Sequence, residues 1–181
     1  MTPTNPPRVK LATVWLDGCS GCHMSFLDMD ERLLDLAYKI ELVYSPLVDF
    51  KVFPDQVDVT LVEGAVSSEE DIEKIRHIRA HTKILVALGD CAVTSNVPSM
   101  RNPVGREAIL NRAYIQNAQV KPHIPTVDIP RLAPHARPIH EIVAVDAFIP
   151  GCPPHADLIY QAVSDLLAGK TPNFGTTARF G

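Results

Sequence analysis

The sequence has no cluster of basic residues, no long hydrophobic run and few aromatic residues. Its 181 residues include 17 Lys and Arg against 21 Asp and Glu, a net charge of -4, and the basic residues are dispersed. Nucleic acids and anionic membranes are bound through clustered positive charge, which is missing here. The longest apolar runs, such as Ile84–Leu88, are far shorter than a transmembrane helix requires. We therefore expect neither nucleic acid nor a membrane as a partner.

Two further signals are missing from the sequence. The amino-terminal segment has no apolar region after its basic residues and no twin-arginine pair, which predicts a cytoplasmic protein without a secretory signal. No G-x-G-x-x-G fingerprint for a nicotinamide cofactor occurs, so the sequence does not identify an electron acceptor. The chain has four cysteines, and in a reducing compartment cysteines are more often metal ligands or redox groups than disulfide partners.

The hydrophobic pattern alternates between strand-like and helix-like segments. Short runs rich in Val, Ile and Leu predict strands at Val9–Trp15, Ile40–Tyr44, Val57–Val62, Lys83–Leu88 and Ile142–Phe148. Apolar residues at helical spacing predict helices at Gly21–Lys39, at Ser67–His81, which opens on a capping box of Ser67 and Glu70, and at Pro154–Gly169. This alternation predicts one α/β domain, residues 1–181, with a flavodoxin-like, doubly wound and mostly parallel sheet.

One stretch interrupts the alternation, and we call residues 98–140 the excursion. Seven of the sixteen prolines fall between residues 98 and 138. Apart from a helix expected at 106–118, the excursion shows little periodicity and is predicted to be irregular. It is either a surface loop or an arm that packs on a partner subunit, since loops of this length often have a function.

The four cysteines share one kind of position in the predicted fold. Cys19 and Cys22 follow the first strand, Cys91 follows the fourth and Cys152 follows the fifth. In open parallel sheets, ligands bind at the carboxyl ends of the strands. Cysteines that are far apart in the sequence are therefore expected to converge on a single site.

Four thiolates suit either tetrahedral zinc or an iron–sulfur cluster. Structural zinc commonly takes two close cysteine pairs, whereas Cys91 and Cys152 each lie about 60 residues or more beyond the preceding cysteine, which favours a larger cluster. The sequence of Cys19, Cys22 and His23 also matches the C-x-x-C-H attachment site of c-type haem, although this leaves Cys91 and Cys152 without a role. FMN remains open for a flavodoxin-like fold, but the first loop does not carry a phosphate-binding motif.

Four motifs in register resemble the small subunits of nickel–iron hydrogenases. They read C-S-G-C-H-M-S-F-L at 19–27, V-E-G-A-V at 62–66, G-D-C-A at 89–92 and P-G-C-P-P at 150–154. The related quinone-reductase subunit of respiratory complex I shares much of this pattern but has adjacent cysteines in the first motif. The two residues between Cys19 and Cys22 favour the hydrogenase family.

The resemblance implies a role for each cysteine. Cys19, Cys22, Cys91 and Cys152 would bind a proximal 4Fe-4S cluster, facing a nickel–iron site in a separate large subunit. Glu63 matches a glutamate near the subunit interface, for which proton transfer, a role in the cluster environment or no special role remain open. Trp15 is expected in the core, and the histidines expected at the surface or an interface are His123, His135, His140 and His155.

The resemblance also suggests a subtype. No cysteine follows Cys152, so the chain can hold one cluster only, and the glycine pair typical of membrane-linked members is absent after Cys91. This pattern is similar to the soluble, bidirectional, NAD-reducing hydrogenases, whose electrons pass to an iron–sulfur and flavin diaphorase module. A subunit of another hydrogenase, or of a complex I-like oxidoreductase with a different acceptor, stays open. A four-cysteine zinc interaction module is the alternative from another class.

Overall fold

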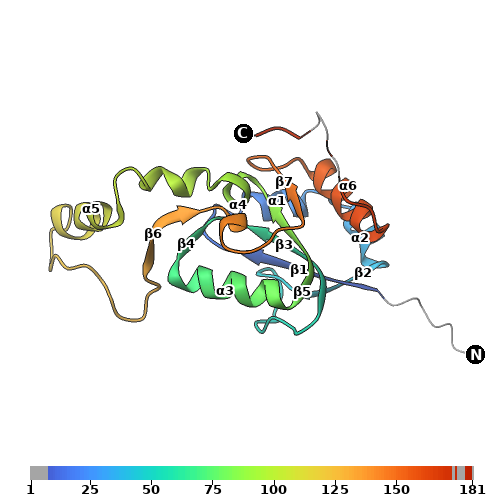
Figure 1. Cartoon of the computed structure of the whole chain (residues 1–181), viewed down its shortest axis with the longest axis horizontal. Coiled ribbons are helices and arrows are strands. Elements are labelled where there is room, and N and C mark those ends of the chain that lie inside the picture. Colours follow the sequence, from blue (N-terminus) through green and yellow to red (C-terminus); the bar gives the residue numbers. More distant parts are fainter. Residues whose placement is uncertain (1–7, 173, 175–177, 181) are drawn as a thin grey trace, which may run out of the picture.

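The computed structural model of the chain describes residues 8–172, 174 and 178–180. Its centre is a sheet of five parallel strands in the order β2-β1-β3-β5-β7 (Figure 1). The strands are β1 (Val9–Trp15), β2 (Ile40–Tyr44), β3 (Val57–Glu63), β5 (Thr82–Leu88) and β7 (Ala147–Ile149). This order is that of flavodoxin-like doubly wound folds, so the predicted fold class is confirmed.

Helices cover both faces of the sheet, because side chains of successive strand residues point to opposite sides. Val86 and Leu88 of β5 join the apolar cluster under α1 (Gly21–Leu27), α2 (Arg32–Ala37) and α6 (Ala156–Leu167). Leu85 and Ala87 join the cluster under α3 (Glu69–Ala80) and α4 (Asp90–Thr94). None of the helices in the described part of the chain is both long and apolar enough to span a bilayer.

The single helix predicted over residues 21–39 is wrong, because the segment forms the two short helices α1 and α2. Asp30, between them, has a φ of 50°, which an α-helix does not accommodate. Met29 turns inward there and is fully buried, while its neighbours Asp28 and Asp30 stay exposed. The apolar spacing continues through this break, which explains why the sequence pattern suggested one helix.

The capping box of α3 lies one residue later than predicted. The Asp71 amide donates to Ser68 Oγ over 3.0 Å, and the Ser68 amide donates to Asp71 Oδ2 over 2.9 Å. Ser67 is not the N-cap, because its hydroxyl donates to the carboxylate of Asp17 instead of accepting from the first turn of α3. Both serines belong to β4 (Val66–Ser68). A capping box opens α3 as predicted, but its residues are Ser68 and Asp71 instead of Ser67 and Glu70.

The strand predicted at 142–148 is also displaced. A 3-10 turn, η3 (Ile139–Glu141), opens this segment, and β7 begins only at Ala147. Ile142, Val143 and Val145 pack against the core from an irregular backbone, so an apolar run was mistaken for a strand. Before β7, Asp146 Oδ2 accepts hydrogen bonds from the Leu85 amide and from Arg79, at 2.7 and 2.6 Å.

The excursion is more regular than predicted. It contains the 3-10 helix η1 (Val97–Arg101), α5 (Arg106–Asn111), the π-helical turn η2 (Arg112–Gln116) and β6 (Leu132–Arg137), so the helix expected at 106–118 is confirmed in large part. Strand β6 pairs antiparallel with β4 in a separate two-stranded sheet. Pro134 suits this edge position, because it cannot donate to a neighbouring strand.

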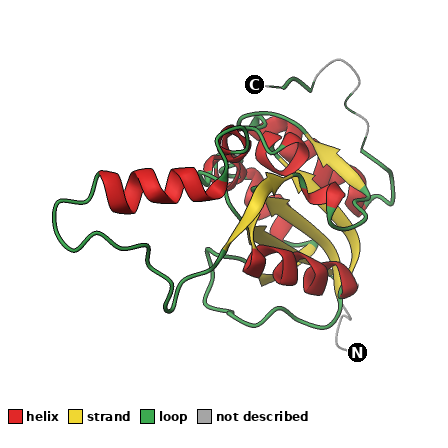
Figure 2. Ribbon diagram, turned by 60° about the vertical axis from the view of Figure 1, so that its left-hand side comes forward, coloured by secondary structure: helices red, strands yellow, loops and turns green. Residues whose placement is uncertain are grey.

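Part of the excursion stands away from the body of the protein. Residues 106–131, here called the arm, run out along α5 and η2 and return as an extended segment to β6 (Figures 1 and 2). Arg101 and Asn102 fix the base of the arm, because Arg101 donates to the carbonyls of Ser67 and Ala133 and Asn102 donates to the carbonyl of Ala136. The arm is therefore anchored at β4 and β6.

Replacing Ser68 with alanine should destabilise the chain by about 1 kcal/mol, the usual cost of losing a helix N-cap. The substitution removes the acceptor of the Asp71 amide and leaves the first turn of α3 with an unpaired donor. Denaturant unfolding of the variant measures the loss. Ser164→Ala, inside α6 and away from its cap, is the matched control and should change stability by less than about 0.5 kcal/mol. Equal effects of the two substitutions would contradict the assignment of the cap.

Candidate functional site

The four cysteines lie beyond the carboxyl ends of three strands of one parallel sheet. Cys19 and Cys22 follow β1, Cys91 lies in α4 directly after β5, and Cys152 follows β7. Strand β3 runs between β1 and β5 and ends at Glu63, which pairs in register with Trp15 on one side and Leu88 on the other. The predicted placement at this edge is confirmed, and Glu63 lies in the middle of it.

The thiols are near enough to one another to interact electrostatically. Burial raises the pKa of the Cys22 thiol far above its ordinary value, and the charges of Glu63 and the other three cysteines raise it further. Burial also raises the pKa of Cys91, with smaller contributions from Cys152 and Cys19. Cys19 and Cys152 are exposed, so the site has a buried side at Cys22 and an open side toward solvent.

A glycine makes room for the buried thiol. Gly89, the residue before α4, has φ 82° and ψ 161°, a conformation that side chains rarely tolerate. A Cβ atom at this position would lie 2.2 Å from Cys22 Sγ. The G-D-C motif therefore brings the backbone of one loop directly against the cysteine of another.

Asp90 ties the loop of Cys91 to the loop of Cys152. Its amide donates to the carbonyl of Gly151 over 2.9 Å, and the Gly151 amide donates back to Asp90 Oδ1 over 2.7 Å. The Asp90 side chain is buried, where hydrogen bonds to a carboxylate are stronger than at the surface. Sequence reasoning missed this residue, although its place beside Cys91 in the third motif was a signal.

A second set of hydrogen bonds joins the motif at residues 19–27 to the motif at residues 62–66. Glu63 Oε2 accepts a hydrogen bond from the His23 amide over 3.0 Å and also contacts His23 Nδ1. Glu63 and His23 are 1% and 2% exposed, so this pair is inaccessible to water. Trp15 stacks on the His23 ring with centroids 6.0 Å apart, and it is 37% exposed rather than in the core as predicted.

The third tie connects helix α1 to the loop of Cys152. The hydroxyl of Ser25 donates to the carbonyl of Pro154, which lies two residues after Cys152. The contact is buried and spans 129 residues of sequence. Together with the pairs at Asp90 and Glu63, it fixes the cysteine loops relative to one another.

The structure places His23 differently from the four histidines that were predicted at the surface or an interface. His23 is buried against Glu63, which disfavours a role as an axial haem ligand, because such a ring must face the haem. The four predicted at the surface are exposed, as expected: His123, His135, His140 and His155.

The donor chemistry at this edge suits a soft metal centre. Four thiols of a single site are the ligand set of zinc or of an iron–sulfur cluster. Within residues 8–172, 174 and 178–180, no three side chains of His, Cys, Asp or Glu are grouped closely enough to hold one metal ion.

Comparison with known proteins places the chain in a family. Residues 19–166 match the family model described as NADH ubiquinone oxidoreductase, 20 Kd subunit. The chain belongs to this family. The matched region of the 20 Kd subunit family begins at Cys19 and includes all four cysteines.

The relatives of the chain confirm the resemblance to hydrogenase subunits. It is 45% identical over 168 residues to the delta subunit of the NAD-reducing hydrogenase HoxS of Cupriavidus necator, covering 90% of this chain and 80% of the relative. It is 39% identical over 170 residues to a subunit of the F420-non-reducing hydrogenase vhu of Methanocaldococcus jannaschii, covering 93% of this chain but 59% of that relative. A solved NAD+-reducing [NiFe]-hydrogenase, in the H2-reduced state, matches with a TM-score of 0.92 and 40% identity, covering 97% of this chain and 100% of the matched chain.

Gly89→Ala should destabilise the protein by roughly 1–3 kcal/mol more than Gly105→Ala, because only the first introduces a clash in addition to backbone strain. Gly105 is a matched control, since it also precedes a helix and has φ 88° and ψ 147°, but its Cβ would meet nothing within 4 Å. Denaturant unfolding of both variants measures the difference. Equal losses of stability would show that the contact with Cys22 does not constrain this loop.

Proposed function

We propose that this chain is the electron-transfer subunit of a NAD-reducing nickel–iron hydrogenase and that its four cysteines hold one 4Fe-4S cluster. The observation that carries the proposal is their convergence at one sheet edge in a chain 45% identical to a subunit of such an enzyme. In this proposal residues 1–181 act as one cluster-binding domain. The large subunit carries the nickel–iron site, and an iron–sulfur and flavin module handles the nicotinamide.

The cluster would be held from two sides. Cys22 and Cys91 supply ligands from the buried side, while Cys19 and Cys152 supply ligands from the exposed side. When bound, the cluster accepts and donates single electrons. Its exposed side faces the direction from which a partner subunit can approach.

Several residues would support this site without touching the metal. Gly89 keeps the space beside Cys22 free of a side chain, and Asp90 holds the loops of Cys91 and Cys152 at a fixed separation. Glu63 holds the first turn of α1 through the His23 amide and places a carboxylate near the buried thiols. We assign Glu63 to the cluster environment, since its hydrogen bonds orient the loop that carries Cys22.

The arrangement of donors favours a cluster over zinc. A single zinc ion requires four sulfur atoms at about 2.3 Å from one point, which is a tight group. Structural zinc commonly takes two close cysteine pairs, whereas Cys91 and Cys152 come from two separate loops far along the chain from Cys19 and Cys22. The raised pKa of Cys22 and Cys91 means that a metal centre must displace protons from these thiols, as cysteine ligation generally does.

A second candidate has the same cluster but another electron acceptor. Relatives include the F420-non-reducing hydrogenase of M. jannaschii, and the family model is named after a ubiquinone oxidoreductase. The subunits that copurify with the chain distinguish these candidates. A flavin subunit that oxidises NADH supports the first proposal, and its replacement by another acceptor protein supports the second.

Anaerobically purified chain should contain about four iron and four sulfide per polypeptide, as a cubane cluster requires. Replacing Cys19 with serine should lower both contents, because serine is a poor ligand for iron in such clusters. Met24→Ser is the matched control, since Met24 is a sulfur-containing neighbour in α1 that is 56% exposed and is not an expected ligand. One zinc per chain without sulfide would overturn the proposal.

Cys152→Ser should abolish hydrogen-dependent NAD reduction by the assembled complex while sparing NADH oxidation by the flavin module. The reason is that the substitution interrupts electron flow from the large subunit without altering the nicotinamide site, which lies in another subunit. The two activities are measured with the same preparation. Unchanged hydrogen-dependent activity would remove Cys152 from the electron path.

A further inference from the structure

The arm exposes apolar side chains that its own fold does not bury. Six large hydrophobic residues of the arm are exposed, among them Val120 at 79% and Val127 at 76%. The side-chain hydrogen bonds within residues 107–130 are local, joining Arg112 to Gln116 and His123 to the carbonyl of Lys121. Exposed apolar side chains concentrated on one projecting segment favour a protein contact, because their exposure to water is unfavourable.

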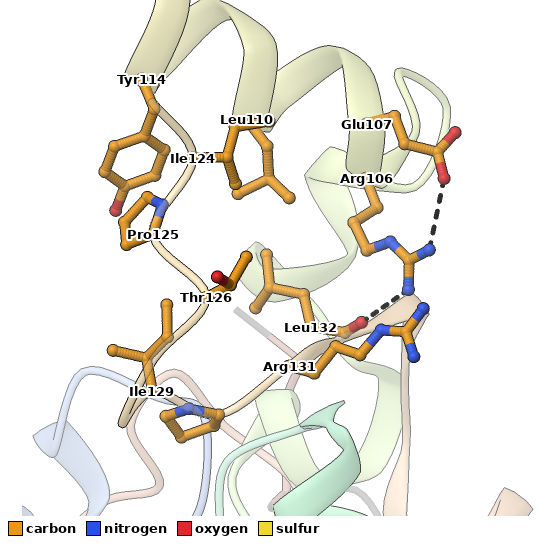
Figure 3. A pocket seen from close by; sticks show the side chains of 11 residues that line it. Arg106, Glu107, Leu110, Tyr114, Ile124, Pro125, Thr126, Ile129, Arg131 and Leu132 are labelled. Atoms are coloured by element: carbon orange, nitrogen blue, oxygen red, sulfur yellow. Dashed lines mark hydrogen bonds and ion pairs between the residues drawn. The ribbon is translucent and has the colours of Figure 1, made fainter. Parts of the chain in front are cut away.

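The arm also encloses a cavity of about 440 Å³ between its helix and its returning segment (Figure 3). Leu110 and Tyr114 line it from the helical side, and Ile124 and Ile129 line it from the returning segment (Figure 3). Helical lining residues belong to α5 and to the π-helical turn η2, a type of turn that is frequent at functional sites. The cavity is wide enough to accept a large apolar side chain from outside.

Charge distinguishes the excursion from the rest of the chain. Residues 98–140 contain six Lys and Arg but only two Asp and Glu. The whole chain contains 17 Lys and Arg and 21 Asp and Glu, so the remaining residues contain eleven basic and nineteen acidic side chains. At the cavity, Arg106 donates to the carbonyl of Leu132 and pairs with Glu107 over 3.2 Å, and the largely exposed Arg131 approaches Glu69 over 3.5 Å. Farther along the arm, Arg112 donates to the side-chain oxygen of Gln116, an uncharged partner that leaves its positive charge available. A basic, apolar surface favours a partner with acidic groups around an apolar centre.

The arm is rooted at the same edge of the molecule as the cysteines. The excursion begins shortly after α4, the helix that carries Cys91. It ends with β6, which pairs with β4, and β4 begins three residues after Glu63. A subunit that covers the exposed side of the cysteine site therefore has the arm beside it. This step rests on the proposed function, which requires such a subunit.

We propose that the arm grips a partner subunit of the hydrogenase, whose contacting segment inserts an apolar side chain into the arm cavity and surrounds it with carboxylates. The occupant is a protein rather than a small molecule, because the exposed apolar residues Val120 and Val127 extend beyond the residues that line the cavity. The contact holds the partner close to the cysteine edge without supplying a ligand to the cluster.

The apolar part of the contact is tested by Tyr114→Asp in the chain coexpressed with the hydrogenase large subunit and the flavin-bearing subunits. The variant should weaken association with one subunit by about tenfold or more, as expected for a buried aromatic contact. Tyr38→Asp, the same change at an 84% exposed residue between α2 and β2, is the control and should leave assembly unchanged. Native mass spectrometry reports which subunit is lost.

The charged part is tested by reversing two arm charges together. The double variant R112E/K121E should weaken the same contact by about tenfold, and wild-type association should weaken with rising salt. The double variant K51E/R76E is the control, because it changes net charge equally at exposed positions outside the arm. If Tyr114→Asp and R112E/K121E both assemble as the wild-type chain does, the proposal is overturned.

Amide hydrogen exchange tests the contact in the unaltered complex, independently of how any variant folds. Residues 106–131 should become protected when the chain assembles with the partner, and absence of added protection would overturn the proposal. Association of tagged with untagged copies of this chain through the arm would overturn it too, by identifying a second copy as the occupant. The iron and sulfide content of the wild-type chain distinguishes failure of the arm proposal from failure of the proposed function. A wild-type chain without a cluster contradicts the proposed function and leaves the arm proposal standing.

Discussion

The candidate site depends on the buried hydrogen bonds between Asp90 and Gly151. They join the loops after β5 and β7, which carry Cys91 and Cys152, so that two cysteines far apart in sequence share one edge. The contacts of Glu63 with His23 and of Ser25 with Pro154 attach α1, with Cys22, to the same frame. Because each tie is buried, its loss would leave polar groups without compensation from water.

The parallel sheet determines where these ties can form. Its strands are covered on both faces, so its carboxyl edge is where their loops are free to converge. Gly89 then allows the third motif to approach Cys22 more closely than any side chain would permit. The geometry of the site therefore depends on the backbone of the sheet edge and of Gly89 as well as on the cysteines.

Much of this was predictable from the sequence, and the failures have physical causes. Strands such as β1 and β5 are short segments rich in apolar residues, and cysteines follow both, so their common edge could be inferred. The ties at Asp90 and Ser25 span 61 and 129 residues, and no local pattern encodes such contacts. The break at Asp30 and the pairing of β4 with β6 also depend on tertiary structure, which periodicity does not include.

The arm and the cysteine edge together suggest one surface for assembly, with the cluster near its centre and the apolar arm at its side. The proposed function requires that the four cysteines form one cluster site. Mössbauer spectroscopy of the iron-57-enriched wild-type chain tests this requirement most directly. We predict the spectrum of one 4Fe-4S cubane in each chain, and a mononuclear iron spectrum, or iron-free protein containing zinc, would contradict it.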